Sequence, residues 1–196
     1  MDTGGNLPRS TSVTGMPEPI PASIAAVVLA GGAGRRFGGA KQLHEVDGRP
    51  MLELVLAAVE RSGITTSVVV LGARADEIAA AVPLHGARPV VCTGWKDGQA
   101  ASLRCGLDAL PVEITAALVV LGDGPRLAPA AIARVSAGRG VRAADYGRGR
   151  SHPVVLPRAV WEALPRTGET PGRSLPATLV DCRDLPEPGD VDYAPA

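Results

Sequence analysis

Short apolar runs alternate with segments of helical periodicity along most of the chain, and this alternation constrains the fold more than any other feature. Apolar or β-branched runs predict strands at Ile24–Ala30, Ser67–Leu71, Arg88–Cys92 and Thr115–Leu121. Apolar residues at helical spacing predict helices at Pro50–Ser62, Arg74–Val82, Gln99–Leu110 and Pro129–Ala137. Strands that alternate with helices form right-handed β-α-β units, so the sequence predicts an α/β three-layer sandwich with a mostly parallel sheet.

The alternation weakens after Gly138. Further elements are predicted as strands at Val141–Tyr146, Pro153–Leu156 and Thr178–Cys182, with a short helix at Arg158–Leu164. The run GRGVRAADYGRGR, residues 138–150, is typical of a loop or hairpin rather than of a linker. We therefore expect one domain over residues 22–196, preceded by a disordered leader over residues 1–21 that is rich in Gly, Pro, Ser and Thr.

A glycine-rich segment with positive charge, LAGGAGRRFGGAKQL over residues 29–43, directly follows the first predicted strand. Ligands of parallel α/β sheets bind at the carboxyl ends of the strands. Glycines let backbone N–H groups approach a ligand and form an anion-binding nest, and Arg35, Arg36 and Lys41 add fixed positive charge. A nucleoside triphosphate suits this environment. A solvated glycine-rich turn is the alternative interpretation.

Two familiar phosphate-binding motifs do not match this segment. A Walker A loop needs Gly-Lys-Ser/Thr, whereas Ala40 precedes Lys41 and Gln42 follows it. The dinucleotide fingerprint needs a third glycine where this chain has Phe37. Neither a P-loop ATPase nor a dehydrogenase is therefore favoured.

Three other places carry candidate site residues. Asp123 ends an apolar strand and can bind Mg²⁺ or cap the turn before Pro125. Asp97, Gly98 and Ser102 lie where a loop enters a helix, and ordinary helix capping by Asp97 or Ser102 is the alternative. His152 precedes Pro153, and a structural role is the alternative to ligand contact.

Charge and composition exclude several classes of protein. A net charge of zero and 3% aromatic residues argue against nucleic-acid binding. No apolar stretch approaches the roughly 20 residues of a membrane span, and the N-terminus lacks a signal-peptide core. The cysteines form no Cys-x-x-Cys pair and, with the histidines, no zinc spacing, so we expect a reduced, cytoplasmic protein.

Five segments in order make the chain resemble the MobA-like nucleotidyltransferases. They are the glycine-rich segment, GWKDGQAASLRCGL at 94–107, VVLGDGP at 119–125, SHPVVLPRAVWEAL at 151–164 and GDVD at 189–192. Within the family the chain looks most like molybdenum-cofactor cytidylyltransferases. The resemblance implies a Rossmann-like (GT-A-like) sheet and transfer of a nucleoside monophosphate from CTP or GTP to molybdopterin, with release of pyrophosphate. A molybdoenzyme or chaperone is an implied partner.

The same resemblance implies roles for individual residues. Lys41, Arg36 and Asp123 are expected to be catalytic, with Mg²⁺ held by Asp123 and Asp190 and His152 in the acceptor pocket. Asp192 is the alternative to Asp190. The residues expected to contact the nucleotide are Leu29, Ala30, Gly31, Gly32, Gly34, Arg35, Lys41, Asp97, Gly98 and Ser102.

Departures from the family pattern keep alternatives open. Asp123-Gly124-Pro125 replaces the usual Asp-Gln-Pro, and the chain ends soon after GDVD. The Leu-Ala-Gly-Gly start of the loop favours GTP, whereas Lys41-Gln42-Leu43, Gly94-Trp95 and His152-Pro153 favour CTP, the nucleotide that we prefer. Guanylyl, sugar-phosphate or isoprenoid-precursor transfer, and a non-catalytic nucleotide- or pterin-binding protein, are the other functions compatible with the sequence.

Overall fold

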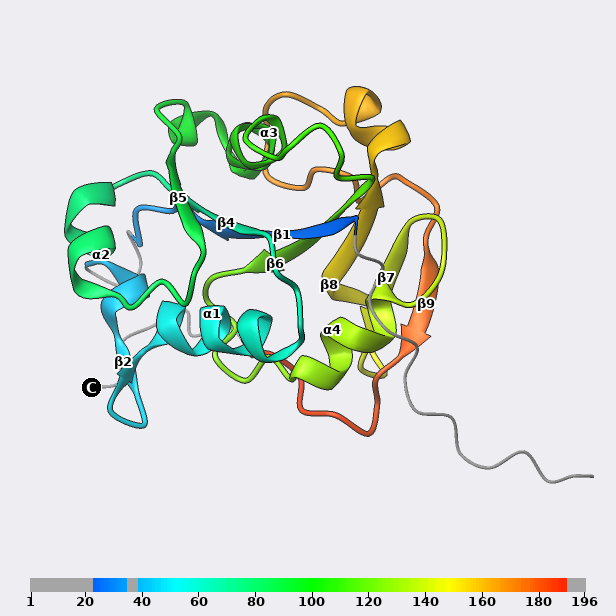
Figure 1. The fold of residues 1–196 in the computed structure, drawn as a ribbon, viewed down its shortest axis with the longest axis horizontal. Coiled ribbons are helices and arrows are strands. Elements are labelled where there is room, and N and C mark those ends of the chain that lie inside the picture. Colours follow the sequence, from blue (N-terminus) through cyan, green and yellow to red (C-terminus); the bar gives the residue numbers. More distant parts are fainter. Residues whose placement is uncertain (1–22, 35–38, 190–196) are drawn as a thin grey trace, which may run out of the picture.

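The computed structural model describes residues 23–34 and 39–189. Their centre is a seven-stranded sheet in the order β5-β4-β1-β6-β8-β7-β9 (Figure 1). The strands are β1 Ile24–Ala30, β4 Ser67–Leu71, β5 Arg88–Val91, β6 Ala116–Leu121, β7 Arg142–Asp145, β8 Arg150–Pro157 and β9 Thr178–Asp181. Strand β8 pairs antiparallel with β6 and β7, and every other pairing in this sheet is parallel. The predicted mostly parallel sheet is confirmed.

Helices cover both faces of the sheet, as Figure 1 shows. The helices are α1 Met51–Arg61, α2 Ala75–Ala81, α3 Gln99–Asp108 and α4 Pro129–Ser136, with a 3₁₀ helix at Arg158–Ala163. Two apolar clusters form the core. One joins α1, α2 and α4 to one face of the sheet, and the other joins α3 and Trp161 to the opposite face. The predicted three-layer sandwich is therefore confirmed.

Strand β1 shows why its sequence is apolar throughout. Side chains of a strand alternate between the two faces of a sheet. Val28 accordingly packs in the cluster of α1 and α4, and its neighbour Val27 packs in the cluster of α3. All seven residues of β1 are buried because both faces of this central strand are covered.

The boundaries of the regular elements differ little from prediction, but one small hairpin was not predicted. Strands β2, Glu45–Val46, and β3, Arg49–Pro50, pair antiparallel around Asp47 and Gly48, which have φ values of 53° and 75°. Asp-Gly is the sequence signature of such a tight turn.

The hairpin alternative for residues 138–150 is confirmed, since β7 and β8 pair across this segment with a register shift between Ala143 and Ala144.

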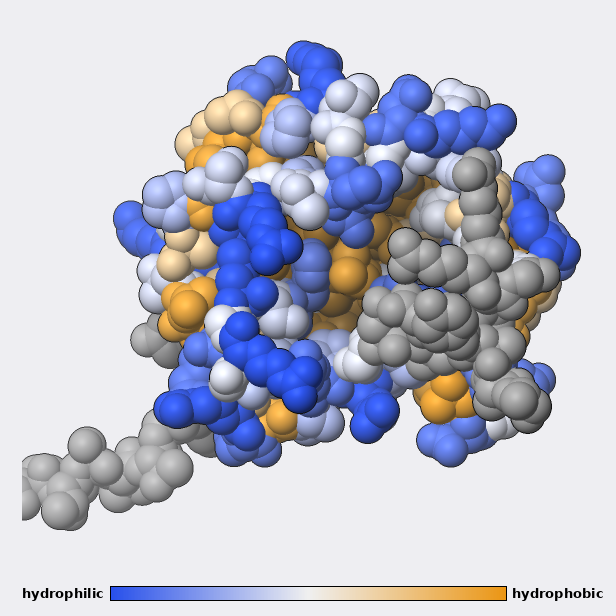
Figure 2. Space-filling view, turned by 180° about the vertical axis from the view of Figure 1, so that it is seen from behind, coloured by the Kyte–Doolittle hydropathy of each residue, from blue (hydrophilic) through white to orange (hydrophobic). Residues whose placement is uncertain are grey.

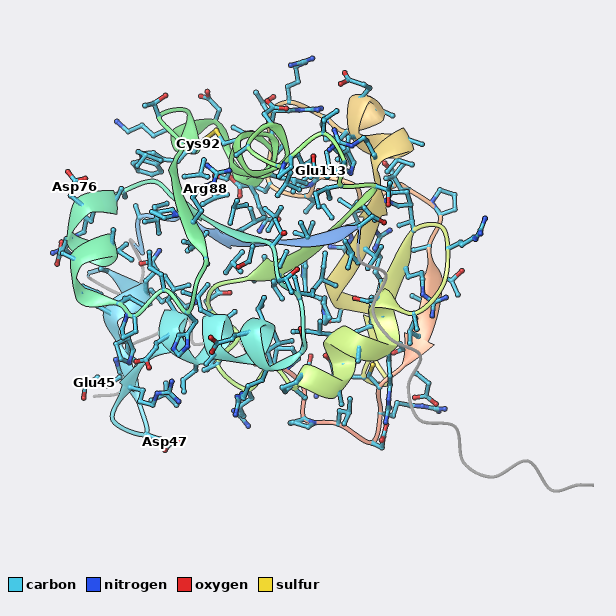
Figure 3. The ribbon with its side chains drawn as sticks, in the orientation of Figure 1. Glu45, Asp47, Asp76, Arg88, Cys92 and Glu113 are labelled. Carbon is cyan, nitrogen blue, oxygen red and sulfur yellow. A yellow bond between two sulfur atoms is a disulfide. The ribbon has the colours of Figure 1, made fainter. Side chains whose placement is uncertain are left out.

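The prediction that all three cysteines are reduced is wrong. Cys92 and Cys105 form a disulfide with a Cα–Cα distance of 5.8 Å, drawn in yellow beside the label of Cys92 in Figure 3. Cys182 is free and buried. Cys92 directly follows β5 and Cys105 lies on α3, so the sheet topology and not sequence spacing brings them together. The cysteine argument for a cytoplasmic location therefore fails, and that location stays a prediction.

The surface opposite the view of Figure 1 is hollowed, with a hydrophobic floor and a hydrophilic rim (Figure 2).

Within residues 23–34 and 39–189, no helix is long and apolar enough to cross a membrane.

Removal of residues 1–21 is expected to leave the melting temperature and the activity nearly unchanged. These residues, predicted to form a disordered leader, lie outside the described part of the chain. Their composition cannot bury a core, and β1 begins only at Ile24. Thermal unfolding of the shortened chain measures the effect, with a deletion through residue 27 as a control that cuts β1. A loss of several degrees on removal of 1–21 would contradict the prediction.

Candidate active site

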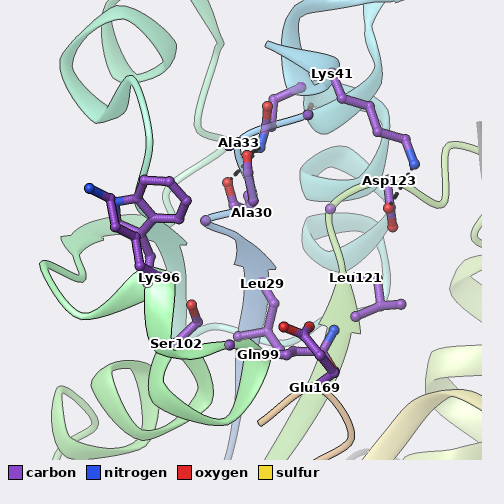
Figure 4. Close-up of a pocket in the computed structure, with 17 residues that line it drawn as sticks. Leu29, Ala30, Ala33, Lys41, Lys96, Gln99, Ser102, Leu121, Asp123 and Glu169 are labelled. Atoms are coloured by element: carbon purple, nitrogen blue, oxygen red, sulfur yellow. Dashed lines mark hydrogen bonds and ion pairs between the residues drawn. The ribbon is translucent and has the colours of Figure 1, made fainter. Parts of the chain in front are cut away.

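A cleft of about 490 Å³ opens at the carboxyl ends of β1 and β6 (Figure 4). It is lined by Leu29, Ala30, Gly31, Gly32, Ala33, Gly34, Lys41, Gln42, Trp95, Lys96, Gly98, Gln99, Ser102, Leu121, Gly122, Asp123 and Glu169. Most of the residues predicted to contact a nucleotide are in this set. These residues therefore meet at the carboxyl ends of the strands, where the alternation of strands and helices predicts a ligand site.

The glycine-rich loop is held in shape by Gln42. This buried side chain donates from Nε2 to the carbonyl oxygens of Ala30, at 2.7 Å, and Gly32, at 3.1 Å. Gly34 has a φ of 60°, and a Cβ there would lie 2.1 Å from the carbonyl oxygen of Gly39. Only glycine fits this close approach, so the start of the loop is fixed by its own sequence.

Lys41 and Asp123 form an ion pair inside the cleft. The Lys41 Nζ lies 3.0 Å from Asp123 Oδ2, and the two side chains are 13% and 35% exposed. Parallel register places Leu29 of β1 opposite Leu121 of β6, so Asp123 leaves the sheet beside the glycine-rich loop. The structure therefore joins two predicted catalytic residues that are 82 positions apart in sequence.

The opposite wall of the cleft comes from the start of α3. Ser102 is buried, and its Oγ lies close to Gly31, where an added Cβ would be 3.1 Å away. Gly98 also lines the cleft, whereas Asp97 does not. The Asp97 carbonyl oxygen instead accepts a 2.9 Å hydrogen bond from the N–H of Gly168. Nucleotide contact by Asp97 stays a prediction.

Several residues that line the cleft were not singled out from the sequence. They include Gln42, Trp95, Lys96, Gln99 and Glu169, of which Gln42 and Trp95 entered only as indications of the preferred nucleotide. Trp95, Lys96 and Gln99 lie in the segment GWKDGQ. Their position next to Gly98, a predicted site residue, could have identified them from the sequence. Glu169 lies in a loop after β8 that carries no such signal.

Four predicted site residues fall outside the described part of the chain: Arg35, Arg36, Asp190 and Asp192.

A second cavity of about 340 Å³ adjoins the cleft at Leu121, which lines both. Its lining is Val120, Leu121, Gly124, Leu127, Arg148, Ser151, His152, Glu187, Pro188 and Gly189. A Cβ on Gly124 would come within 2.9 Å of the Pro188 Cβ. Pro188 therefore occupies the space that a glutamine would need at position 124, which accounts physically for the Asp-Gly-Pro sequence.

His152 is held neutral in the wall of the second cavity. Desolvation lowers the pKa of its imidazole from 6.5 to about 4, and the nearby charge of Arg150 adds to the effect. A neutral imidazole can donate one hydrogen bond and accept another. His152 thus lies next to the Asp123 turn, and its neutral state suits hydrogen bonding to an uncharged part of a ligand.

His152 is expected to make stability fall in mild acid. Between pH 6.5 and about 4 the unfolded chain binds a proton at this imidazole and the folded chain does not, so unfolding becomes easier as the pH drops. Calorimetric melting of His152→Gln between pH 4.5 and 7.5 is expected to show a weaker pH dependence than the parent. His44→Gln, outside both cavities, is the control. Identical pH dependence in His152→Gln and the parent would contradict the prediction.

One strand-end carboxylate is a sufficient protein contribution to a magnesium site. Mg²⁺ keeps several waters and binds one or two carboxylates together with substrate phosphates. Asp123 supplies one carboxylate beside the glycine-rich loop. In the described part of the chain no three His, Cys, Asp or Glu side chains gather as a metal cluster. The residues present fit a metal that arrives with a nucleotide.

This sheet, with its glycine-rich loop, lysine and strand-end aspartate at one cleft, defines a nucleotidyltransferase type of α/β protein. Residues 26–182 match the sequence model of the MobA-like NTP transferase domain, and the chain belongs to this family.

Two relatives illustrate the range of similar sequences. Nicotine blue oxidoreductase of Paenarthrobacter nicotinovorans is 31% identical over 189 residues, which cover 86% of this chain and 92% of that protein. The bifunctional protein GlmU of Trichlorobacter lovleyi is 35% identical over 115 residues, 58% of this chain and 25% of that protein. The similarity therefore spans about a quarter of the length of this much longer relative.

Solved structures agree with the fold. Rv0371c from Mycobacterium tuberculosis H37Rv has a TM-score of 0.75 at 31% identity, covering 87% of this chain and 92% of that one. Its homologue from Mycobacterium sp. strain JC1 also has a TM-score of 0.75, at 27% identity and 88% and 91% coverage. A manganese complex of Rv0371c has a TM-score of 0.67 at 28% identity, with 81% and 87% coverage. Divalent metal binding thus occurs among the neighbours.

Proposed function

We propose that this protein is a Mg²⁺-dependent nucleotidyltransferase that transfers a nucleoside monophosphate from CTP or GTP to a phosphate on a molybdopterin-type acceptor and releases pyrophosphate. The observation that carries the proposal is the adjacency of two cavities at the end of β6. The glycine-rich loop and Lys41 line one, His152 lines the other, and they share Leu121. Two substrates bound there would meet beside Asp123.

Attack of an acceptor phosphate on the α-phosphorus builds negative charge on the transferred group and on the departing pyrophosphate. Lys41, Arg36 and the backbone of Gly31, Gly32 and Gly34 would hold the phosphate oxygens, and catalysis would come from positioning and charge stabilisation. Mg²⁺, when bound, neutralises charge on the phosphates. Asp123 would hold it, with Asp190 as the proposed second carboxylate.

The nucleotide would lie along the cleft with its base at the α3 wall. Ala30, Gly31, Gly98 and Ser102 offer backbone and hydroxyl groups to a base edge, and Leu29 offers an apolar contact. Arg35 would add positive charge near the triphosphate. We favour CTP over GTP because three of the four distinguishing segments are of the cytidylyl type.

The acceptor would occupy the second cavity. Its walls combine apolar side chains with Arg148, Ser151 and the neutral His152, a mixture that suits a flat, polar heterocycle bearing a phosphate. This chemistry fits molybdopterin. The proposed location is the cytoplasm, and a molybdoenzyme or its chaperone is the proposed recipient of the product.

Pyrophosphate release tests the proposal. The purified protein is incubated with Mg²⁺, with CTP or GTP, and with or without molybdopterin. Release that requires both substrates is the expected result. Nucleotide binding with no release for any phosphate acceptor would leave a non-catalytic nucleotide- or pterin-binding protein. Release with sugar phosphates or isoprenoid precursors alone would keep the class and replace the acceptor.

An oxidoreductase is the second candidate, because the similarity to nicotine blue oxidoreductase extends over most of both chains. The absence of the dinucleotide fingerprint in the glycine-rich segment argues against a nicotinamide dinucleotide at this loop. Bleaching of nicotine blue with a reduced nicotinamide cofactor, without pyrophosphate release, would favour this candidate over nucleotidyl transfer.

A further inference from the structure

Two polar side chains of the cleft, Gln99 and Glu169, make no polar contact with other residues of the described chain. Gln99 is the first residue of α3, and Glu169 lies in the loop that follows the 3₁₀ helix Arg158–Ala163. Both line the cleft. Within residues 23–34 and 39–189, neither side chain makes a hydrogen bond or an ion pair. Their polar atoms are therefore available to a ligand.

Backbone contacts fix these two residues next to each other. The N–H of Ala100 donates to the carbonyl oxygen of Gly168 at 2.8 Å, and the N–H of Gly168 donates to Asp97 at 2.9 Å. Gly98 has a φ of 100°, and a Cβ there would lie 2.6 Å from the Gly168 carbonyl oxygen. The loop of Glu169 is thus seated on the start of α3 by contacts that only glycine at position 98 permits.

The position of the pair along the cleft indicates which part of a nucleotide it would meet. Lys41 and Asp123 mark the phosphate end, and Ser102 beside Gly31 marks the base end. In Figure 4, Gln99 and Glu169 lie beneath Leu29, with Ser102 to one side and Leu121 to the other, and Asp123 lies higher in the view, near Lys41. The ribose is the part of a nucleoside triphosphate that lies between base and phosphates.

The chemistry of the two side chains agrees with that position. A carboxylate only accepts hydrogen bonds, and it would repel a phosphate. The 2′- and 3′-hydroxyls of a ribose are a matched pair of donors, and carboxylates bind ribose hydroxyls in other nucleotide-binding folds. The Gln99 amide can donate to one hydroxyl oxygen while the Glu169 carboxylate accepts from both hydroxyls.

On the basis of the proposed function, we propose that Glu169, aided by Gln99, binds the ribose hydroxyls and makes the protein select ribonucleoside over 2′-deoxyribonucleoside triphosphates. A hydrogen bond to a charged group contributes roughly 10- to 100-fold in affinity. Preference of the parent protein for CTP over dCTP, or for GTP over dGTP, is expected to lie in this range.

The experiment measures Kd and kcat/KM for each ribo/deoxy pair, with Mg²⁺, in the parent, Glu169→Ala and Glu169→Gln. Loss of the carboxylate is expected to bring the ribo/deoxy ratio of Glu169→Ala close to one, whereas Glu169→Gln keeps part of it because an amide oxygen still accepts. Turnover of dCTP is expected to fall less than turnover of CTP, because dCTP has only its 3′-hydroxyl contact with Glu169 to lose. Glu162→Gln, an exposed carboxylate outside both cavities, is the control, and thermal unfolding verifies that each variant folds.

The outcomes separate this inference from the function on which it rests. A parent-like ribo/deoxy ratio in Glu169→Ala, with turnover intact, would overturn ribose recognition by Glu169 and leave nucleotidyl transfer standing. A parent protein that turns over CTP and dCTP equally would also overturn it. Absence of binding and turnover with every nucleotide would overturn both proposals.

Discussion

Asp123→Asn is expected to abolish Mg²⁺-dependent turnover while the fold survives. An amide keeps the shape of the carboxylate but loses the charge that would hold a metal against the nucleotide phosphates. Removal of one preorganised charged contact typically costs about 10²- to 10³-fold in rate, and loss of a metal ligand adds to this. The measurement is product formation across a Mg²⁺ titration.

Stability is the second readout for Asp123→Asn. The carboxylate is 35% exposed, so its ion pair with Lys41 contributes at most about 1 kcal/mol to folding. We expect a small change in melting temperature beside the large loss of rate. Asp108→Asn, at the far end of α3, removes an exposed charge as a control. Parent-like turnover of Asp123→Asn at ordinary Mg²⁺ would mean that Asp123 only shapes the turn before Pro125.

The sequence predicted the parts of the site that a local pattern and one topological rule determine. An apolar strand followed by a glycine-rich run marks the end of β1, and a second apolar strand ends at Asp123. Because the carboxyl ends of parallel strands share one edge of the sheet, the two segments had to meet. The structure joins them through Lys41 and Asp123 at 3.0 Å.

Other parts depend on where loops lie after folding, which no local pattern encodes. Glu169 enters the cleft because the backbone of Gly168 binds the start of α3, a contact between segments about 70 residues apart in sequence. Pro188 reaches the second cavity for a similar reason, through the return of the chain to Gly124. The hairpin at Asp47-Gly48, by contrast, was readable from its turn sequence.

Lys41→Ala is expected to lower kcat/KM by about 10²- to 10³-fold, the usual cost of one preorganised charge contact. The Lys41 side chain is 13% exposed, against 35% for Asp123, and a less solvated charge stabilises developing negative charge more strongly than a solvated one. The fold is expected to survive, because the pair is only partly buried and Gln42 still holds the loop.

The controls for Lys41→Ala separate charge from geometry. Lys41→Arg keeps the charge on a longer, planar group and is expected to recover only part of the rate, since a guanidinium cannot adopt the same single contact. Arg139→Ala removes an exposed positive charge outside both cavities and is expected to match the parent. Only Lys41→Ala removes the ammonium group that lies 3.0 Å from Asp123 Oδ2. A loss of rate in both Lys41→Ala and Arg139→Ala would therefore point to a general effect of net charge. Unchanged turnover in Lys41→Ala would remove this lysine from the mechanism.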